Sequence, residues 1–163
     1  MPSHIGRDGG IAMVDVSRKR VTARIACAEA FVRMSPSARA ALRTATLPKG
    51  DAFVAAQIAG IMAAKRTAGL IPLAHPLPLN SVDVRFDWRD DGLLRVEARA
   101  HTTARTGVEL EAMMAASLAA LTIYDMSKSI DKGITIEQVR LVRKSGGKSG
   151  NWTRRSASRA SAV

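Results

Sequence analysis

Residues 81–101 read S-V-D-V-R-F-D-W-R-D-D-G-L-L-R-V-E-A-R-A-H, and this stretch decides the fold class. Apolar side chains stand at every second position of its first part, at Val82, Val84, Phe86 and Trp88. This alternation has the two-residue period of a strand, and residues 93–101 alternate again. Between them Asp90-Asp91-Gly92 is a turn signal, so the stretch predicts an antiparallel hairpin.

The segments before the hairpin predict one strand and two helices. Residues 21–34 alternate like a strand. A serine and a proline at 35–36 open a short helix, because serine caps helix N-termini and proline fits the first turn. A second, longer helix is expected to begin after Asp51 as its N-cap and to end at Gly69. Three prolines in residues 70–78 require an extended or turning chain.

After the hairpin, the sequence predicts a long helix and a last strand. Residues 108–130 are apolar on nearly every side, so we expect this helix to be buried all round. A strand follows at 134–142. The order β-α-α-β-β-α-β predicts an α+β, two-layer, ferredoxin-like domain, with an antiparallel or mixed sheet covered by helices on one face.

Length and composition fit one globular domain. The chain has 163 residues, of which 47% are hydrophobic, and this excludes a wholly disordered protein. We expect a flexible segment at 1–12, one catalytic domain at 13–152 and a basic disordered tail at 153–163. A single cysteine, Cys27, excludes an internal disulfide and favours a reducing, cytoplasmic location. No uncharged apolar run is long enough to span a bilayer.

The formal net charge of +11 predicts a polyanionic partner. Nucleic acid, an anionic membrane surface and a small phosphorylated ligand are the classes to consider. Aromatic residues make up only 4% of the chain, which is too few for a platform that stacks single-stranded bases. No strongly amphipathic basic helix favours a membrane surface. A nucleic-acid-binding module stays open on charge alone.

The helix predicted at 108–130 carries Glu109, Glu111, Asp125 and Lys128. Asp125, Lys128 and Lys132 are spaced to share one face, where a buried acid would have a shifted pKa. An ordinary ion pair on the helix surface is the alternative. Glu111 and Asp125 are separated by about 21 Å along the axis. Either the ligand is long, or two subunits contribute opposite ends of this helix to one pocket.

Two further motifs are candidates for binding or catalysis. His75 lies between Pro72 and Pro76 in a preset backbone, although a core histidine is an equal alternative. Residues 144–150, K-S-G-G-K-S-G, place two lysines around a diglycine, which suits a phosphate cradle or simply a basic loop. This loop is not a P-loop, because Val142 replaces the first required glycine. We expect no metal site.

Several stretches together resemble one family. They are M-V-D-V-S at 13–17, K-G-D-A-F-V-A-A-Q-I-A-G-I-M-A-A-K-R-T-A-G-L-I-P-L-A-H-P-L at 49–77, G-V-E-L-E-A-M at 107–113, L-T-I-Y-D-M-S-K at 121–128 and the glycine loop at 144–150. In this order they are similar to the cyclic pyranopterin monophosphate synthase family, molybdenum cofactor biosynthesis protein C. The resemblance covers residues 13–152. The chain departs from the family at Ala74, Leu110 and Ser127, where we expect Cys, Met and often Cys.

The resemblance implies a lyase that converts (8S)-3',8-cyclo-7,8-dihydroguanosine 5'-triphosphate to cyclic pyranopterin monophosphate and releases pyrophosphate. It further implies a homohexamer, a trimer of dimers with pockets between subunits, and a hand-over of substrate from the radical enzyme of the preceding step. No cofactor is required, although Mg²⁺ could accompany the triphosphate. A non-catalytic homologue that binds a nucleoside triphosphate is the alternative.

The resemblance also implies roles for individual residues. The substrate-binding set is Leu73, Ala74, His75, Leu110, Glu111, Glu109, Lys49 and Lys144, and the catalytic set is Asp125, Lys128 and His75. Our hypothesis is that Lys49, Lys128 and Lys144 hold phosphates. Asp125 and His75 would then move protons, and Glu111 would orient the base-derived ring.

Overall fold

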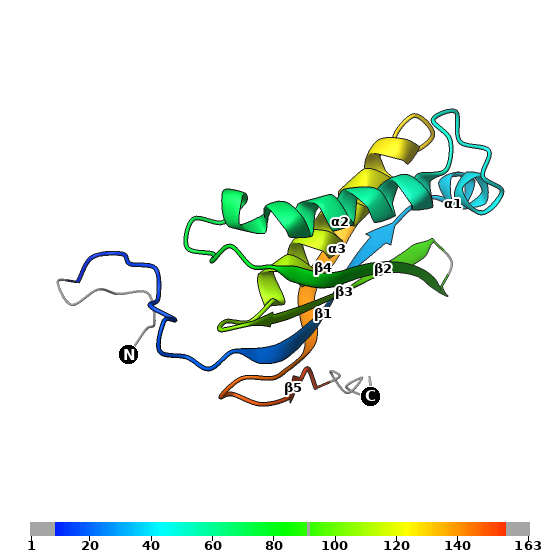
Figure 1. Ribbon diagram of the computed structural model, residues 1–163. Coiled ribbons are helices and arrows are strands. Elements are labelled where there is room, and N and C mark those ends of the chain that lie inside the picture. The colour runs from blue at the N-terminus through cyan, green and yellow to red at the C-terminus, as the bar shows by residue number, and fades with distance from the viewer. Residues whose placement is uncertain (1–8, 91, 156–163) are drawn as a thin grey trace.

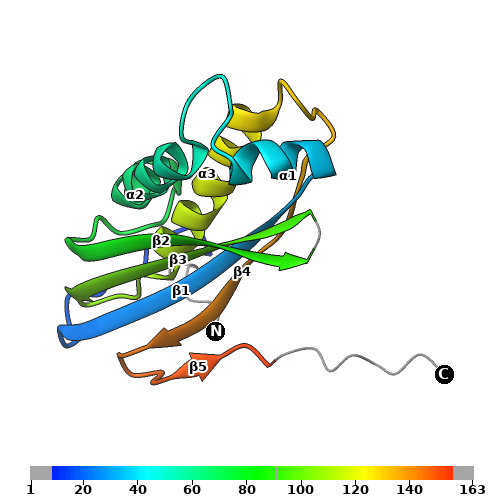
Figure 2. The same ribbon diagram turned by 90° about the vertical axis from the view of Figure 1, so that its right-hand side faces the viewer.

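A computed structural model describes residues 9–90 and 92–155. The strands are β1 (Thr22–Arg33), β2 (Leu79–Asp90), β3 (Leu93–Ala104), β4 (Thr135–Ser145) and β5 (Trp152–Thr153), and the helices are α1 (Pro36–Arg43), α2 (Ala52–Leu70) and α3 (Glu109–Ser127). The strands form one antiparallel sheet in the order β2-β3-β1-β4-β5. Figures 1 and 2 show the helices gathered on one face of this sheet. The α+β two-layer prediction is confirmed, and β1 to β4 have the ferredoxin-like order.

Three sequence predictions about the second half of the chain are wrong. Helix α3 ends at Ser127, so Lys132 lies in the following turn and does not share a helix face with Asp125. The helix is also not buried all round, because Leu121 is 50% exposed. The helix is apolar on nearly every side, but the sheet and α2 cover only part of its circumference. The last strand continues to residue 145, so Lys144 belongs to β4.

The core between sheet and helices is built from small side chains. Its alanines are Ala26, Ala28 and Ala30 on β1, Ala38 on α1, Ala52, Ala56 and Ala64 on α2, Ala98 and Ala100 on β3, and Ala112, Ala115, Ala116, Ala119 and Ala120 on α3. Gly60 of α2 lies so close to α3 that an added Cβ would be 2.9 Å from the carbonyl oxygen of Ala115. Such small residues let α2 and α3 pack tightly against each other and against the sheet.

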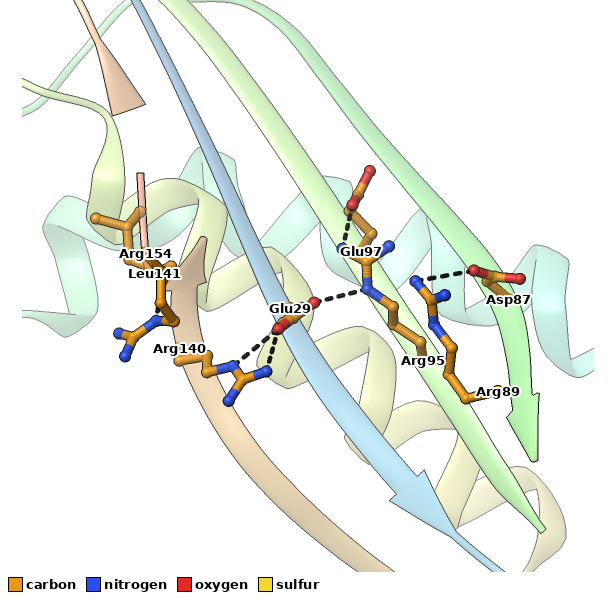
Figure 3. A network of polar contacts seen from close by, with 8 residues as sticks. All are labelled: Glu29, Asp87, Arg89, Arg95, Glu97, Arg140, Leu141 and Arg154. Carbon is orange, nitrogen blue, oxygen red and sulfur yellow. Dashed lines mark hydrogen bonds and ion pairs between the residues drawn. The ribbon is translucent and has the colours of Figure 1, made fainter. Parts of the chain in front are cut away.

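The opposite face of the sheet carries a network of charged side chains (Figure 3). Glu29 of β1 is only 6% exposed, and it accepts bonds from Arg95 of β3 at 2.6 Å and from Arg140 of β4 at 2.7 Å. Burial alone would raise the pKa of Glu29, but the bonds and charges of the two arginines outweigh burial and lower it. Arg95 also pairs with Glu97. The network therefore joins the three central strands.

The chain ends lie partly beyond the described residues. The tail predicted at 153–163 is outside them from residue 156 onward, as are residues 1–8 of the predicted N-terminal segment. Thr153 of β5 pairs with Arg143 of β4, and Arg154 donates from Nε to the carbonyl oxygen of Leu141 at 2.7 Å. None of the helices in the described part of the chain combines the length and apolar character needed to cross a bilayer.

We predict that Gly60→Ala lowers the free energy of unfolding by about 1–3 kcal/mol, because the new methyl group overpacks the contact with α3. Gly69→Ala is the matched control in the same helix, since nothing lies within 4 Å of its added Cβ. That control should be neutral or stabilising by about 0.5–1 kcal/mol. Denaturant unfolding of both variants checks this, and equal effects at both positions would contradict the tight helix contact.

Candidate functional site

The predicted site residues fall into two groups at opposite ends of α3. His75, Glu109, Leu110 and Glu111 lie at its start, together with Leu73 and Ala74. Asp125 and Lys128 lie at its end, together with Lys49 from the loop before α2. Figure 1 shows how the length of α3 keeps its two ends apart. The helix thus separates the two groups within one chain, as the spacing of Glu111 and Asp125 predicts.

A pocket of about 280 Å³ lies at the start of α3. It is lined by Val14, Val16 and Lys19 from the N-terminal segment, Leu73, Ala74, His75 and Leu77 from the loop before β2, and Thr106, Gly107, Glu109, Leu110 and Glu111 around the start of the helix. The three proline residues of residues 71–78 keep that loop out of helix and sheet, so it can turn back over the pocket.

The two glutamates of this pocket have different surroundings. Glu111 is 4% exposed, and burial raises the pKa of its carboxyl group, to which the charge of nearby Glu109 adds. A backbone hydrogen bond opposes this rise in pKa only in part. Glu109 instead pairs with Lys144 Nζ at 2.8 Å. The pocket therefore contains one buried acid with a raised pKa and one ion pair.

Lys144 lies on β4, paired with Ala26 of β1, and a glycine loop follows it. Gly146 and Gly147 have φ of 94° and 74°, in the left-handed region that favours glycine. An added Cβ would collide with the backbone of residue 23 at Gly146 and with the guanidinium of Arg24 at Gly147. Arg24 in turn donates from Nε to the carbonyl oxygen of Ala104 at 3.1 Å. The loop thus packs tightly on β1, beside the pocket.

The group at the end of α3 is a carboxylate between two ammonium groups. Asp125 accepts from Lys128 Nζ at 2.8 Å and from Lys49 Nζ at 3.0 Å. We expected Asp125 to be buried, and this is wrong, because its side chain is 52% exposed. The hydrogen bonds from Lys128 and Lys49 lower the pKa of Asp125, so in the single chain it is an ionised, solvent-facing acid.

Ser127 follows this group on the buried side of the helix. It is 0% exposed, and its hydroxyl has no hydrogen-bond partner among the described residues. An unpaired buried hydroxyl costs free energy, whereas a thiol is a weaker hydrogen-bonding group. The resemblance leads us to expect cysteine at this position. The surroundings of Ser127 suit a cysteine, because a buried thiol needs a hydrogen-bond partner less than a hydroxyl does.

Sequence reasoning missed the contribution of the N-terminal segment. Lys19 lines the pocket, and the carbonyl oxygen of Val14 accepts from His75 Nε2 at 2.8 Å. The basic run at 18–20, directly after the M-V-D-V-S stretch, was the available signal. Among the described residues, no three His, Cys, Asp or Glu side chains are grouped in a way that could hold a metal ion.

Comparison with known proteins identifies relatives along most of the chain. Residues 13–147 match the MoaC family. A protein of Thermomicrobium roseum is 48% identical over 153 residues, which cover 93% of this chain and 92% of that protein. It is named cyclic pyranopterin monophosphate synthase. The matched region includes both groups of site residues.

We predict that the free energy of unfolding of Glu111→Gln, compared with that of wild type, rises progressively as pH rises from below about 4.5 toward neutrality. A raised folded-state pKa gives wild type its full stability only below the ordinary glutamate value of 4.5, and this stability is lost as pH rises toward the folded pKa. Glutamine does not titrate. The free energy of unfolding of both proteins, measured against pH at one protein concentration, checks this.

Glu29→Gln provides a control of opposite sign. Because the pKa of Glu29 is lowered in the folded chain, its contribution is present above the ordinary value of 4.5 and is lost as pH falls. Glu29→Gln should therefore be most destabilising near neutral pH. A difference between wild type and Glu111→Gln that does not change with pH would show that Glu111 titrates as an ordinary glutamate.

Proposed function

The chain belongs to the MoaC family, and from this premise we infer that it is a lyase acting as a cyclic pyranopterin monophosphate synthase in molybdenum cofactor biosynthesis. The observation that carries this inference is identity of 48% to a synthase over 93% of the chain. The substrate is (8S)-3',8-cyclo-7,8-dihydroguanosine 5'-triphosphate. A new phosphate ester forms within the product while the bond to the leaving pyrophosphate breaks.

The charges of the two groups suit a triphosphate. Lys19 and Lys144 lie at the start of α3, and Lys49 and Lys128 lie at its end. Ammonium groups bind phosphate as point charges, and they stabilise a leaving pyrophosphate in the same way. We assign phosphate binding to Lys49, Lys128 and Lys144, as hypothesised from the sequence. With bound phosphates, the lysines would exchange their present carboxylate partners for the ligand.

We propose that one active site uses both groups, each from a different copy of the chain. The pocket of about 280 Å³ lies just below the usual range of roughly 300–1,000 Å³ for small-molecule sites. It also lacks Asp125, which lies at the far end of a rigid helix. A second copy in the reverse orientation would bring its Asp125 and Lys128 to this pocket.

The outer face of α3 supports such an arrangement. Leu110, Met114, Leu121 and Asp125 recur at helical spacing, and the two leucines are 41% and 50% exposed. Two copies of α3 packed antiparallel about a two-fold axis near Ser117 would place Leu110 of one copy next to Asp125 of the other. This packing would cover the apolar stripe and complete two identical sites at once.

Within this site, Asp125 and His75 are proposed to move protons, and Glu111 to orient the base-derived ring. Contact with a second copy would bury Asp125, and burial raises the pKa of a carboxyl group. Asp125 would then be better matched to acid–base work near neutral pH than it is in the single chain. We propose no resident cofactor, and any Mg²⁺ would accompany the triphosphate.

The proposal extends to assembly and location. A homohexamer built as a trimer of dimers would use the two-fold contact described above. One buried cysteine, Cys27, suits the reducing cytoplasm. The labile substrate would be handed over by the radical enzyme of the preceding step.

We predict that Asp125→Asn lowers turnover of the cyclised triphosphate by about 10²–10⁴-fold, because it removes a proton-transfer group. Substrate binding should be largely retained. Release of pyrophosphate and formation of the pyranopterin are the measurements. Asp83→Asn is the matched control, since Asp83 is an exposed acid paired with Arg85 on β2. Full turnover by Asp125→Asn would remove Asp125 from the catalytic set.

Subunit sharing predicts complementation between two inactive variants. In a hybrid of Asp125→Asn and His75→Ala chains, one of the two sites at a two-fold contact receives intact residues from both copies. The other site carries both substitutions. Each contact between one chain of each variant should therefore restore about half of its wild-type activity. In hexamers purified through two tags after random co-assembly, where about half of the two-fold contacts are mixed, the total should be about a quarter of wild type. A hybrid as inactive as its parents would contradict a site shared between subunits.

A further inference from the structure

Residues 14–19 form a short strap over the pocket at the start of α3. Its inner side chains, Val14, Val16 and Lys19, line the pocket. Two successive turns shape the strap. The carboxylate of Asp15 accepts from the backbone N–H of Ser17 at 2.8 Å, and the carbonyl oxygen of Val16 accepts from the N–H of Lys19 at 3.0 Å.

The strap meets the pocket histidine through one hydrogen bond. His75 Nε2 lies 2.8 Å from the carbonyl oxygen of Val14. A carbonyl oxygen can only accept, so Nε2 carries the proton in this contact. In the neutral ring Nδ1 then holds the lone pair, and the imidazole has one nitrogen left to accept a proton. The contact thus favours the tautomer in which Nδ1 is the nitrogen that can act as a base.

The side chain of Asp15 takes no part in the hydrogen bond between Val14 and His75. Its side chain is exposed, and its hydrogen bond to Ser17 lies within the strap. The bond holds the pKa of Asp15 below its usual range, so the carboxylate is ionised at neutral pH. Aspartate commonly closes such side-chain-to-backbone turns. Without the turn, residues 14–17 would regain backbone freedom, and the Val14 carbonyl would no longer be held on His75.

We propose that Asp15 is a positioning residue, which holds the Val14 carbonyl on His75 Nε2 through the Asp15–Ser17 turn and so keeps Nδ1 available as the proton acceptor. This inference rests on the proposed function, because it concerns how His75 is prepared for the synthase reaction. It does not require Asp15 to touch the substrate.

The contact predicts a spectroscopic signature that needs no substrate. The chain has three histidines, so a protein carrying His4→Gln and His101→Gln, labelled with ¹⁵N-histidine, reports on His75 alone. We expect a protonated Nε2 whose N–H proton exchanges slowly with water. In the same background Asp15→Ala should lose this slowly exchanging resonance. Asp15→Asn should keep it, because the amide oxygen still accepts from the Ser17 N–H.

Turnover in the otherwise wild-type chain completes the test. Asp15→Ala should lower kcat/KM by roughly tenfold, since misplacing a reacting group by a small distance has effects of this size or larger. Asp15→Asn should recover most of the loss. Thermal unfolding of the oligomer at one concentration shows whether Asp15→Ala remains folded.

The outcomes separate this inference from the proposed function. A protein with turnover in which Asp15→Ala keeps both the His75 resonance and kcat/KM would overturn the role of Asp15 alone. A wild-type His75 protonated on Nδ1 would do the same, and so would an Asp15→Asn variant as impaired as Asp15→Ala. Absence of synthase turnover in the wild type would overturn the proposed function, while the resonance would still report the strap contact.

Discussion

Close packing of small side chains where α2, α3 and the sheet meet is the constraint on which the rest of the structure depends. Gly60 of α2 lies against the backbone of Ala115, and alanines on β1 and β3 form the floor beneath α3. Interiors packed at this density admit few alternative arrangements. The 19 residues of α3 are therefore held in one position as a rod of about 28 Å.

This rod keeps the two groups of candidate site residues apart within one chain. Glu111 lies at its first turn and is buried, whereas Asp125 lies at its last turns and faces solvent between two lysines. In the single chain the acid with the raised pKa is Glu111, and Asp125 is ionised. In the proposed active site, a second copy of the chain would bring the end of its own α3 to the pocket at the start of the first.

Two further features join segments that are distant in the sequence. On the far face of the sheet, Glu29 joins Arg95 and Arg140, so the central strands are held together from the face opposite α1, α2 and α3. At the pocket itself, the N-terminal strap contributes Lys19 and a carbonyl bond to His75. The strap lies far from α3 in the sequence, and it meets the helix start only because the fold brings β1 and the loop before β2 together.

The sequence by itself determined the elements β1 to β4 and α1 to α3 and the fold class, although not the short β5. Alternation at Val82, Val84, Phe86 and Trp88 predicted the hairpin, and capping by Ser35 and Asp51 is present in the structure at α1 and α2. These signals are local, because a strand period or a cap depends on residues a few positions apart. Only the tertiary structure decided the exposure of Asp125, the partner of Lys144 and the place of Lys19. A helix that is apolar on average does not reveal which of its faces the sheet will cover, and contacts between distant segments depend on how the whole core packs.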